Sequence, residues 1–467
     1  MFPEDPISPE AAIDRFLASL KTPVRILVAI SGGSDSSGLL LLLHEALKAA
    51  PDLSISLCAA TVDHALRDES ADEACRVATL CASMGIPHRT MVWQGEKPKT
   101  GILAAAREAR YGLLAEAAEA FDADLIVTGH TLDDQRETLH MRGMRTEQIS
   151  TGIADAVLFD RHFWILRPLL FSTRADIRRF LTARSVAWID DPSNEDVKYE
   201  RVRTRRQLSA EGAAETNICR AWEERLALSS DGAEWLHRHF RLHGGLLGQV
   251  MPGGLRQDRR VLDYALGRLT AVFGGQSFVP GRKQMERLLA FATGGKSGRM
   301  TVGRVVFDLR RDGLYLARES RGILPLVLRS GEAGVWDGRF KARNRSSETV
   351  EITTRAGAVN EATMRNGPSA PDLGSPDSDD RQDNGGWSQG LPKAAWKRAA
   401  ASGPAISAGQ GLLLPEFARS VDLTPHFAAF DRFLTRFDFT FAERLSAVFS
   451  RVPYAEPPLR SIDGKTI

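Results

Sequence analysis

Short apolar runs alternate with longer amphipathic segments between residues 24 and 170. This alternation predicts parallel strands that are joined by helical crossovers. The first and fourth runs are almost continuously apolar, which is typical of strands that helices cover on both faces. We therefore predict an α/β fold with an open, mostly parallel sheet and helices on both faces. The expected strands are 24–30, 54–63, 87–94, 124–130 and 163–170.

Helical periodicity dominates the part of the chain that follows the sheet. Candidate helices cover 222–228, 261–273 and 283–292. Residues 300–319 then predict two strands around an Arg-Asp-Gly turn. Residues 366–390 are too rich in Gly, Pro, Ser and Asp to bury a core, so they predict a disordered insertion.

The length of 467 residues exceeds what one hydrophobic core usually supports, so several domains are expected. We predict that residues 1–206 form the domain with the sheet. Residues 207–320 are expected to form a helical domain that ends in the hairpin. Residues 321–467 are expected to form a small mixed C-terminal region that contains the insertion.

The first residues predict a helix, with Ser8 as its N-cap and Pro9 in its first turn. They lack the basic start and apolar run of a signal peptide, and no later stretch is apolar enough to span a membrane. The 4 cysteines include no Cys-x-x-Cys pair, which fits a reducing cytoplasm. A net charge of +2 argues against a histone-like packaging protein but allows a local basic face.

A glycine-rich turn follows the first predicted strand and leads into an apolar helix. It consists of Ser31, Gly32, Gly33, Ser34, Asp35 and Ser36. Free backbone N–H groups and the helix dipole point at such a turn, so phosphate is its natural ligand. The turn has no lysine and is therefore not a Walker A loop. It matches the SGGxDS signature of PP-loop ATP pyrophosphatases, and a simple helix cap is the alternative interpretation.

A second glycine-rich segment, at residues 294–297, resembles the end of a Walker A motif. Ala290 stands where that motif needs its leading glycine, and the preceding residues are typical of a helix rather than of a buried strand. We interpret this segment as a turn.

Three carboxylates follow the fourth predicted strand, just after His130. Asp133, Asp134 and Glu137 open a helix, and their spacing lets all three face one side. Ligands of open α/β sheets bind at the carboxyl ends of strands, which places these acids near the glycine-rich turn. They can hold Mg²⁺ on ATP phosphates or bind a cationic substrate. Stabilisation of the helix N-terminus by acids is the alternative.

Further polar residues converge on the same crevice. Asp63, His64 and Arg67 end the second strand, and Arg107 and Arg110 lie three residues apart on one helix face. A solvated charged face is the alternative interpretation of the arginine pair.

A basic segment follows the fifth strand, at residues 198–206. Such a cluster suits contact with a phosphate backbone, although a basic run is more often solvated surface. Its cations are Lys198, Arg201, Arg203, Arg205 and Arg206.

Together these motifs resemble one family, the bacterial tRNA(Ile)-lysidine synthases. SGGSDS, VDHALR, AAREARY, GHTLDDQRET, LRPLL and DDPSNEDVKYERVR occur in the family's order over about residues 24–206. The resemblance implies a PP-loop fold of the adenine nucleotide alpha hydrolase type and a two-step reaction. ATP transfers AMP to the oxygen on carbon 2 of the wobble cytidine in tRNA(Ile) with a CAU anticodon, releasing pyrophosphate. The amine of free lysine then displaces AMP, and the tRNA changes from methionine to isoleucine specificity.

The resemblance also implies roles for the residues. Asp35, Asp134 and Glu137 are the candidates for general base, Mg²⁺ ligand and lysine anchor, with Asp35 and Asp134 as the candidate Mg²⁺ ligands. Arg107 and Arg203 are expected to stabilise charge on phosphate or on the adenylated base. The remaining residues expected to bind substrate are Asp63, His64, Arg67, Arg110, Arg201 and Arg205.

Two segments depart from the family pattern. Many members have two histidines where this chain has His130 and Thr131, and the usual Arg-Asn-Arg-Ile-Arg is here residues 201–205, Arg-Val-Arg-Thr-Arg. Any role of the missing histidine or asparagine is therefore in doubt here, whereas the charges persist.

Other readings remain open at this point. A PP-loop tRNA thiolase with an iron-sulfur cluster needs ligand cysteines that this chain does not place together. A small-molecule ligase leaves the basic segment without a purpose, and a non-catalytic ATP-responsive RNA-binding protein does not require so many acids. The sequence leaves a homodimer open.

Overall fold

The computed structural model describes residues 6–65, 70–143, 150–190, 203–204, 218–356, 391–408, 411–412, 420–462 and 465–466. The chain divides into two compact units. One comprises Met1–Leu226, Phe433–Phe437 and Ala455–Ile467, and the other comprises Ala227–Arg432 and Asp438–Tyr454. We refer to them as the first and the second unit. The insertion predicted at 366–390 lies outside the described residues.

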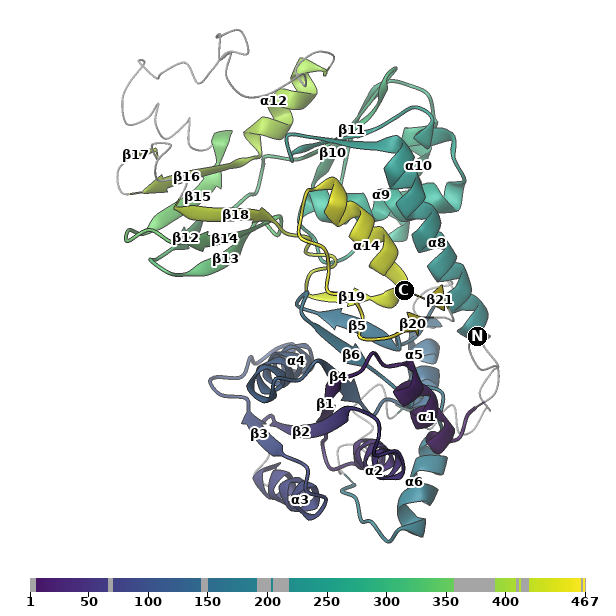
Figure 1. Cartoon of the computed structure of the whole chain (residues 1–467). Coiled ribbons are helices and arrows are strands. Elements are labelled where there is room, and N and C mark those ends of the chain that lie inside the picture. The colour runs from purple at the N-terminus through teal and green to yellow at the C-terminus, as the bar shows by residue number, and fades with distance from the viewer. Residues whose placement is uncertain are drawn as a thin grey trace. The chain divides into compact units, whose positions relative to one another are not determined.

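A seven-stranded sheet forms the centre of the first unit, in the order β19-β5-β6-β4-β1-β2-β3 (Figure 1). Five of its strands are parallel and coincide with the five predicted strands, which confirms the mostly parallel sheet. They are β1 (Val24–Ala29), β2 (Ile55–Asp63), β3 (His88–Val92), β4 (Leu125–Thr128) and β6 (Phe163–Leu166).

Two antiparallel strands that were not predicted extend one edge of this sheet. They are β5 (Ala156–Phe159), which pairs with β6, and β19 (Phe433–Thr435), which pairs with β5. Residues late in the chain therefore complete the sheet of the first unit. The two-stranded ribbon of β20 (Ser461–Ile462) and β21 (Lys465–Thr466) belongs to the same unit.

Helices cover both faces of the sheet, as predicted. Figure 1 shows α4 (Ile102–Phe121) on one side of β1 to β3, with α2 (Ser34–Ala49) and α3 (Ser70–Ser83) on the other. On the α4 side, Tyr111 and Leu114 belong to the same buried core cluster as Leu27 of β1. Burial of such apolar surface is the main force that holds the layers together.

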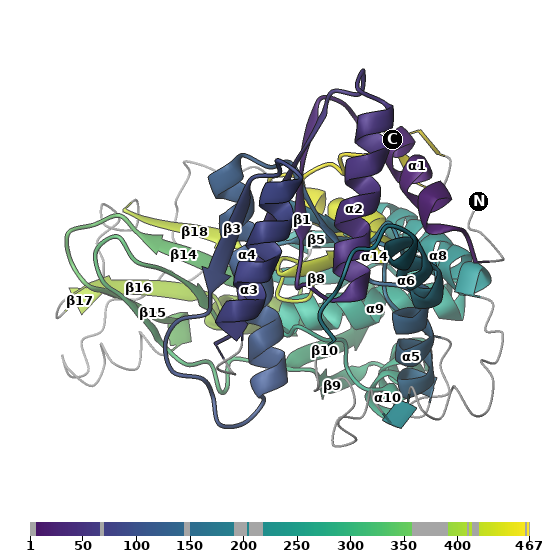
Figure 2. The same cartoon turned by 90° about the horizontal axis from the view of Figure 1, so that it is seen from below.

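Helix α1 (Pro9–Ser19) starts where the sequence predicted, because the Ser8 hydroxyl accepts a hydrogen bond from Ala11 N at 3.2 Å. Helix α5 (Leu132–Gly143) follows β4, and α6 (Arg174–Ala183) lies beside α2 (Figure 2). The approach of α6 to α2 depends on Gly38, since a Cβ at that position would lie 2.3 Å from Ile177 Cγ2.

The strand order creates a switch point between β1 and β4. The chain runs from β1 to β2 and β3 on one side of β1, and then returns to its other side as β4. Ligands of doubly wound sheets bind at the carboxyl ends of strands at such a point. The glycine-rich turn after β1 and the acids after β4 both lie there.

The second unit contains helices and an antiparallel sheet in the order β7-β8-β11-β10-β9. The predicted hairpin is confirmed as β10 (Val305–Arg310) and β11 (Gly313–Arg318), and the three candidate helices are confirmed as well. Strands β7 (Phe240–His243), β8 (Leu247–Val250) and β9 (Gly298–Val302) were not predicted. The helices are α8 (Ile218–His239), which begins in the first unit, α9 (Arg259–Gly274) and α10 (Arg282–Thr293), with a 3-10 turn at Gly254–Arg256.

Two small sheets complete the second unit and share one apolar core, which includes Trp336, Ile352 and Val421. They contain β12 (Leu326–Leu328), β13 (Ala333–Trp336), β14 (Phe340–Asn344), β15 (Val350–Thr354), β16 (Pro404–Ala408), β17 (Gly411–Leu412) and β18 (Val421–Pro425). Helices α12 (Lys393–Ala401) and α14 (Arg436–Val448) lie in the same part of the chain, although α14 begins in the first unit.

The boundaries predicted after residues 206 and 320 stay a proposal. Residues 205–217, around the first of them, lie outside the described part of the chain. The Walker-like segment at 294–297 connects the end of α10 to β9. None of the described helices combines the length and the apolar character needed to cross a membrane.

Candidate active site at the switch point

The glycine-rich turn, residues 31–36, connects β1 to the N-terminus of α2. Ser36 Oγ accepts a hydrogen bond from Ser31 N and donates one to the carbonyl oxygen of Gly33, each at 3.1 Å. Gly33 is the N-cap of α2, and no side chain caps the first N–H groups of that helix. These N–H groups and the helix dipole make the turn suitable for binding phosphate.

The end of β4 lies directly against this turn. A Cβ on Gly129 would be 2.8 Å from the backbone carbon and oxygen of Asp35 and 2.9 Å from Ser36 N. Only glycine permits this approach, because the atoms that a side chain would meet belong to the backbone. The structure thus brings the segment with the acids against the phosphate turn.

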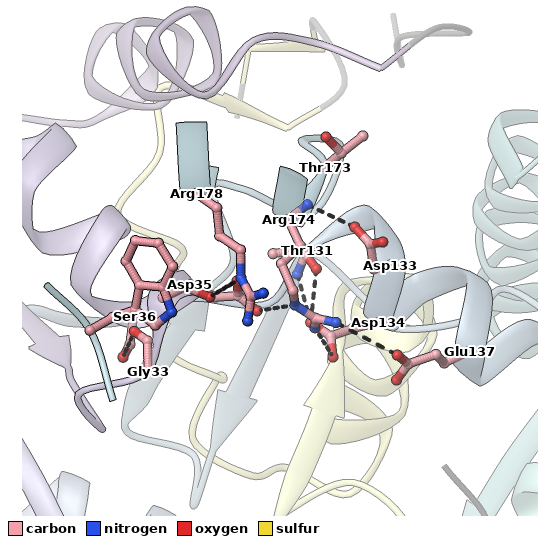
Figure 3. A network of polar contacts seen from close by, with 12 residues as sticks. Gly33, Asp35, Ser36, Thr131, Asp133, Asp134, Glu137, Thr173, Arg174 and Arg178 are labelled. Atoms are coloured by element: carbon pink, nitrogen blue, oxygen red, sulfur yellow. Dashed lines mark hydrogen bonds and ion pairs between the residues drawn. The ribbon is translucent and has the colours of Figure 1, made fainter. Parts of the chain in front are cut away.

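Arg174 lies at the centre of the acid cluster (Figure 3). Its Nε is 2.8 Å from Asp35 Oδ2, its Nη2 is 3.4 Å from Asp134 Oδ1, and its Nη1 is 3.8 Å from Glu137 Oε1. Glu137 is almost fully buried, and the other three side chains are less than one fifth exposed. One guanidinium therefore joins the acids of α2 and α5, and sequence reasoning did not find this residue.

The start of α5 fixes the positions of two acids. Asp134 Oδ2 accepts hydrogen bonds from Thr131 N at 2.9 Å and from the Thr131 hydroxyl at 3.1 Å. Asp133 Oδ2 accepts one from the backbone N of Arg174 at 2.8 Å, which ties the start of α6 to α5. Helix capping thus accounts for one oxygen of Asp134, and its other oxygen faces Arg174.

Burial and the opposite charges shape the electrostatics of the cluster. Burial raises the pKa of the Asp35 carboxyl, and the Arg174 guanidinium offsets this only in part. Burial acts to lower the pKa of Arg174, but the three carboxylates outweigh it, so the pKa of Arg174 is raised. Arg174 thus remains a cation within the cluster.

The residues at the end of β2 form a neighbouring group. The Asp63 carboxylate accepts a hydrogen bond from Ala65 N at 2.7 Å, and the rings of His64 and Trp93 meet edge to face with centroids 6.0 Å apart. The pKa of His64 is lowered by burial and then by Arg110. Asp63, His64 and Arg110 are therefore near one another, and their convergence on the crevice of the acid cluster stays a prediction.

The other predicted basic residues are placed less fully. The Arg107 guanidinium lies 5.1 Å from the centre of the Tyr111 ring, and the described residues show no ion pair between Arg107 and the acid cluster. Arg203 is described together with Thr204 alone, and no role follows from its position. Arg67, Arg201 and Arg205 lie outside the described residues.

Known proteins resemble this chain over nearly its full length. Residues 8–211 match the model of a PP-loop domain. A tRNA(Ile)-lysidine synthase of Rhizobium meliloti is 40% identical over 479 residues, which cover 97% of this chain and 98% of that protein. The chain belongs to the tRNA(Ile)-lysidine synthase family.

Further members of the tRNA(Ile)-lysidine synthase family are similar to this chain. The protein of Mesorhizobium japonicum is 43% identical over 325 residues, covering 67% of this chain and 70% of that protein. The protein of Brucella anthropi is 32% identical over 458 residues, covering 91% and 94%. Membership of this PP-loop family makes the chain an ATP-binding ligase that modifies tRNA.

Within the tRNA(Ile)-lysidine synthase pattern, the threonine at position 131 has a local explanation. Thr131 stands where many members have a second histidine, and here it supplies the two hydrogen bonds that hold Asp134. His130 keeps a contact of its own, since its Nδ1 lies 2.9 Å from Thr128 Oγ1. The side chain of Thr131 thus adds a second hydrogen bond to the one that the backbone N gives Asp134.

Asp35 is the candidate Mg²⁺ ligand that lies within the phosphate turn itself. Mg²⁺ usually binds one or two carboxylates together with substrate phosphates. The two oxygens of Asp35 contact the Ser34 hydroxyl at 3.1 Å and Arg174 Nε at 2.8 Å. Those of Asp134 contact Thr131 and Arg174. Among the described residues there is no group of three or more His, Cys, Asp and Glu side chains that could hold a metal ion.

Proposed function

We propose that this chain ligates lysine to carbon 2 of the wobble cytidine of tRNA(Ile) with a CAU anticodon, at the acid cluster around Arg174. The product is lysidine, and the tRNA then carries isoleucine in place of methionine. The observation that carries this proposal is the link by which Arg174 joins Asp35 of the phosphate turn to Asp134 of α5, at the switch point of the sheet. The family supplies the substrate, because its members are tRNA(Ile)-lysidine synthases.

In the first step, ATP adenylates the base. The oxygen on carbon 2 of cytidine forms a bond to the α-phosphorus, and the bond from that phosphorus to the α–β bridging oxygen breaks. Pyrophosphate leaves with the electron pair. The phosphate turn supports this step, because its uncapped N–H groups can hold the phosphates that leave.

In the second step, the side-chain amine of lysine attacks carbon 2 and AMP leaves. A free lysine amine has a pKa of about 10.4, so only about 1 molecule in 2,500 is neutral at pH 7. The amine therefore needs carboxylates that hold it and a base that takes its proton. Asp134 and Glu137 lie on one side of α5 and are our candidates for these roles.

The positive charge of Arg174 has a role in how the acid cluster binds lysine. With three carboxylates and no cation, the cluster would hold an ammonium group strongly and keep it protonated. Arg174 balances part of this negative charge before lysine arrives. We assign to Asp35 the contact with Mg²⁺, which would neutralise charge on the ATP phosphates. We place the reaction in the cytoplasm, and a homodimer stays a prediction.

Thiolation of tRNA by an iron-sulfur enzyme is less well supported. Cluster ligands are thiolates, and burial raises the pKa of the Cys58 thiol to about 12 and that of Cys81 to about 11. Cys58 also donates its S–H to the carbonyl oxygen of Ile26 inside the core. These two buried thiols therefore do not suit the binding of a cluster, and they act as parts of the core.

Incorporation of labelled lysine tests the proposal. The chain is incubated with radiolabelled lysine, ATP, Mg²⁺ and tRNA(Ile) with a CAU anticodon, and lysine bound to the RNA is measured with AMP and pyrophosphate. We expect Asp35→Ala and Asp134→Ala each to lower incorporation by about 10³-fold, because each removes charge at the reacting groups. Asp52→Ala is the control, since Asp52 is exposed beyond the end of α2. Thiolated RNA, or no lysine transfer by the intact chain, would reject the assignment.

A further inference from the structure

The phosphate turn lacks the lysine by which a Walker A loop contacts the outer phosphates. A nucleoside triphosphate carries several negative charges, and backbone N–H groups supply only partial positive charge. The structure contains a second source of charge beside the turn. It is Arg178, one helical turn after Arg174 on α6.

Arg178 reaches the turn through its guanidinium group. Its Nε lies 3.3 Å from the hydroxyl oxygen of Ser34, the first residue of α2. Figure 3 shows both arginines extending from α6, with Arg174 toward the acids of α5. Two residues four positions apart on one helix therefore serve different ends of the crevice.

Several N–H groups of the Arg178 guanidinium are available to a ligand. Of its five N–H groups, Nε faces Ser34 and one on Nη2 faces Asp190 Oδ1 at 3.0 Å, which leaves three without a hydrogen bond in the described part of the chain. The side chain is 45% exposed, so a ligand can approach it. Arginine is suited to phosphate because its planar fork can donate two parallel hydrogen bonds.

The segment after α6 holds Arg178 beside the turn. The Ile189 N–H donates to the carbonyl oxygen of Gly32 at 2.9 Å, which fixes this segment on the turn. The Trp188 ring lies under Arg178, 5.6 Å from its Cζ, and the Trp188 indole N–H donates to Asp190. Asp190 is 71% exposed, and ion pairs at such positions are weak, so Arg178 can exchange this carboxylate for a phosphate.

From these contacts we infer that Arg178 binds the β- and γ-phosphates of ATP and stabilises pyrophosphate as it leaves. This inference rests on the proposed function and adds a residue to its first step. When the bond between the α-phosphorus and the bridging oxygen breaks, the electron pair adds negative charge to pyrophosphate beside the turn. The guanidinium then donates its unused N–H groups to these oxygens.

Exchange of labelled pyrophosphate into ATP isolates this step, because adenylation is reversible when lysine is omitted. The full chain is assayed with tRNA(Ile), and the KM values for ATP and pyrophosphate are measured for Arg178→Gln. We expect both to rise by roughly ten- to hundredfold, the effect of losing charged hydrogen bonds. In the complete reaction the KM for lysine should change by less than about twofold, since Arg178 faces the turn.

Arg179→Gln is the matched control. Arg179 is the next residue of α6, and its side chain is 77% exposed and pairs with Asp176. Arg178→Lys should recover part of the lost affinity, because it keeps the charge without the planar fork. If Arg178→Gln fails to fold, as judged by its thermal transition, Arg178→Lys is compared with Arg179→Lys in the same way.

The outcomes separate this inference from the proposed function. If the intact chain neither exchanges pyrophosphate nor transfers lysine, the proposed function is wrong. If the intact chain is active and the Arg178 variants match the Arg179 variants in both KM values, the inference is wrong. A rise in the KM for lysine alone would also overturn it, since that result would place Arg178 in the second step.

Discussion

Arg174 occupies the first position of α6, where the helix dipole disfavours a cation. Burial acts to lower the pKa of Arg174 as well, but the carboxylates of Asp35, Asp134 and Glu137 outweigh burial, and the pKa of Arg174 is raised. The same contacts cross from α6 to α2 and α5. Arg174 thus links α2, α5 and α6 at the site, although a cation at the N-terminus of α6 is unfavourable for that helix.

Replacement of Arg174 by glutamine tests this role. It removes the positive charge that Arg174 supplies to the three carboxylates, and removal of one partner from a buried ion pair typically costs about 3–5 kcal/mol. We expect the free energy of unfolding to fall by an amount in this range and lysine incorporation to fall by at least about 10²-fold. Urea denaturation and the incorporation assay measure the two effects.

Arg179→Gln again provides the control for Arg174. Arg179 is 77% exposed, so its replacement should change stability by less than about 0.5 kcal/mol. Equal stability and activity in the two variants would show that the acid cluster does not need its cation.

The sequence around Arg174 contains a pattern that predicts the start of a helix, although Arg174 belongs to none of the motifs described above. Thr173 is followed three residues later by Asp176, a pattern that predicts a helix start, and the structure has the Thr173 hydroxyl 2.6 Å from Asp176 Oδ2. A helix that starts after a strand places its first residues at the crevice. The partners of Arg174 cannot be predicted this way, because Asp35 is 139 positions away.

At the scale of elements, the junction between β4 and α2 determines whether the two halves of the site meet. Gly129 leaves no room for a side chain against the backbone of Asp35 and Ser36. A change at this junction moves the acids of α5 relative to the phosphate turn. The site is therefore sensitive to a residue with no functional group.

We expect Gly129→Ala to lower the free energy of unfolding by about 1–3 kcal/mol, because the added methyl group overpacks the junction. The KM for ATP should rise in the same variant. Gly112→Ala is the control on α4, where a Cβ would meet nothing within 4 Å, and it should be neutral or stabilising by up to about 1 kcal/mol. Thermal denaturation compares the variants, and equal transitions would contradict the packing argument.

The elements that the sequence predicted and those that it missed differ in physical character. The parallel strands β1 and β4 are mostly buried apolar runs, so their composition alone indicates them. Strand β5 is also a buried apolar run, but its 4 residues and the 3 residues of β19 show no period of their own. The pairing of β19 with β5 depends on residues that lie far apart in the chain, and no local pattern encodes it.

At the scale of the whole molecule, the second unit contains a buried ion pair of its own. Asp431 accepts hydrogen bonds from Arg451 at 2.7 Å, from the Tyr454 hydroxyl at 2.8 Å and from Phe427 N at 2.9 Å. Burial acts to raise the pKa of Asp431, but the contacts with His426 and Arg451 outweigh it and hold the pKa well below its usual range.

This lowered pKa predicts a loss of stability in acid. A carboxyl with a lowered pKa in the folded state stabilises the fold above its unfolded pKa of about 3.9, and this contribution declines as the pH falls further. Asp431→Asn should cost about 3 kcal/mol at pH 6, because Arg451 stays buried without a counter-charge, and less at pH 3. Urea denaturation at both pH values measures the difference.

The exposed pair of Asp422 with Arg345 serves as the control for Asp431. Asp422 is 42% exposed, so Asp422→Asn should cost less than about 1 kcal/mol at either pH. A cost for Asp431→Asn that is the same at pH 6 and pH 3 would contradict the assigned charge state.

The late segments of the chain affect when the ATP-binding unit can form during synthesis. Strand β19 closes one edge of its sheet, and Arg460 N donates to the carbonyl oxygen of Ser19 at 2.7 Å. A ribosome that has made only the first 432 residues has released every residue of the phosphate turn and the acid cluster, but not this edge strand. During synthesis, the edge of the sheet at β5 therefore stays uncovered until residues 433–435 have been translated.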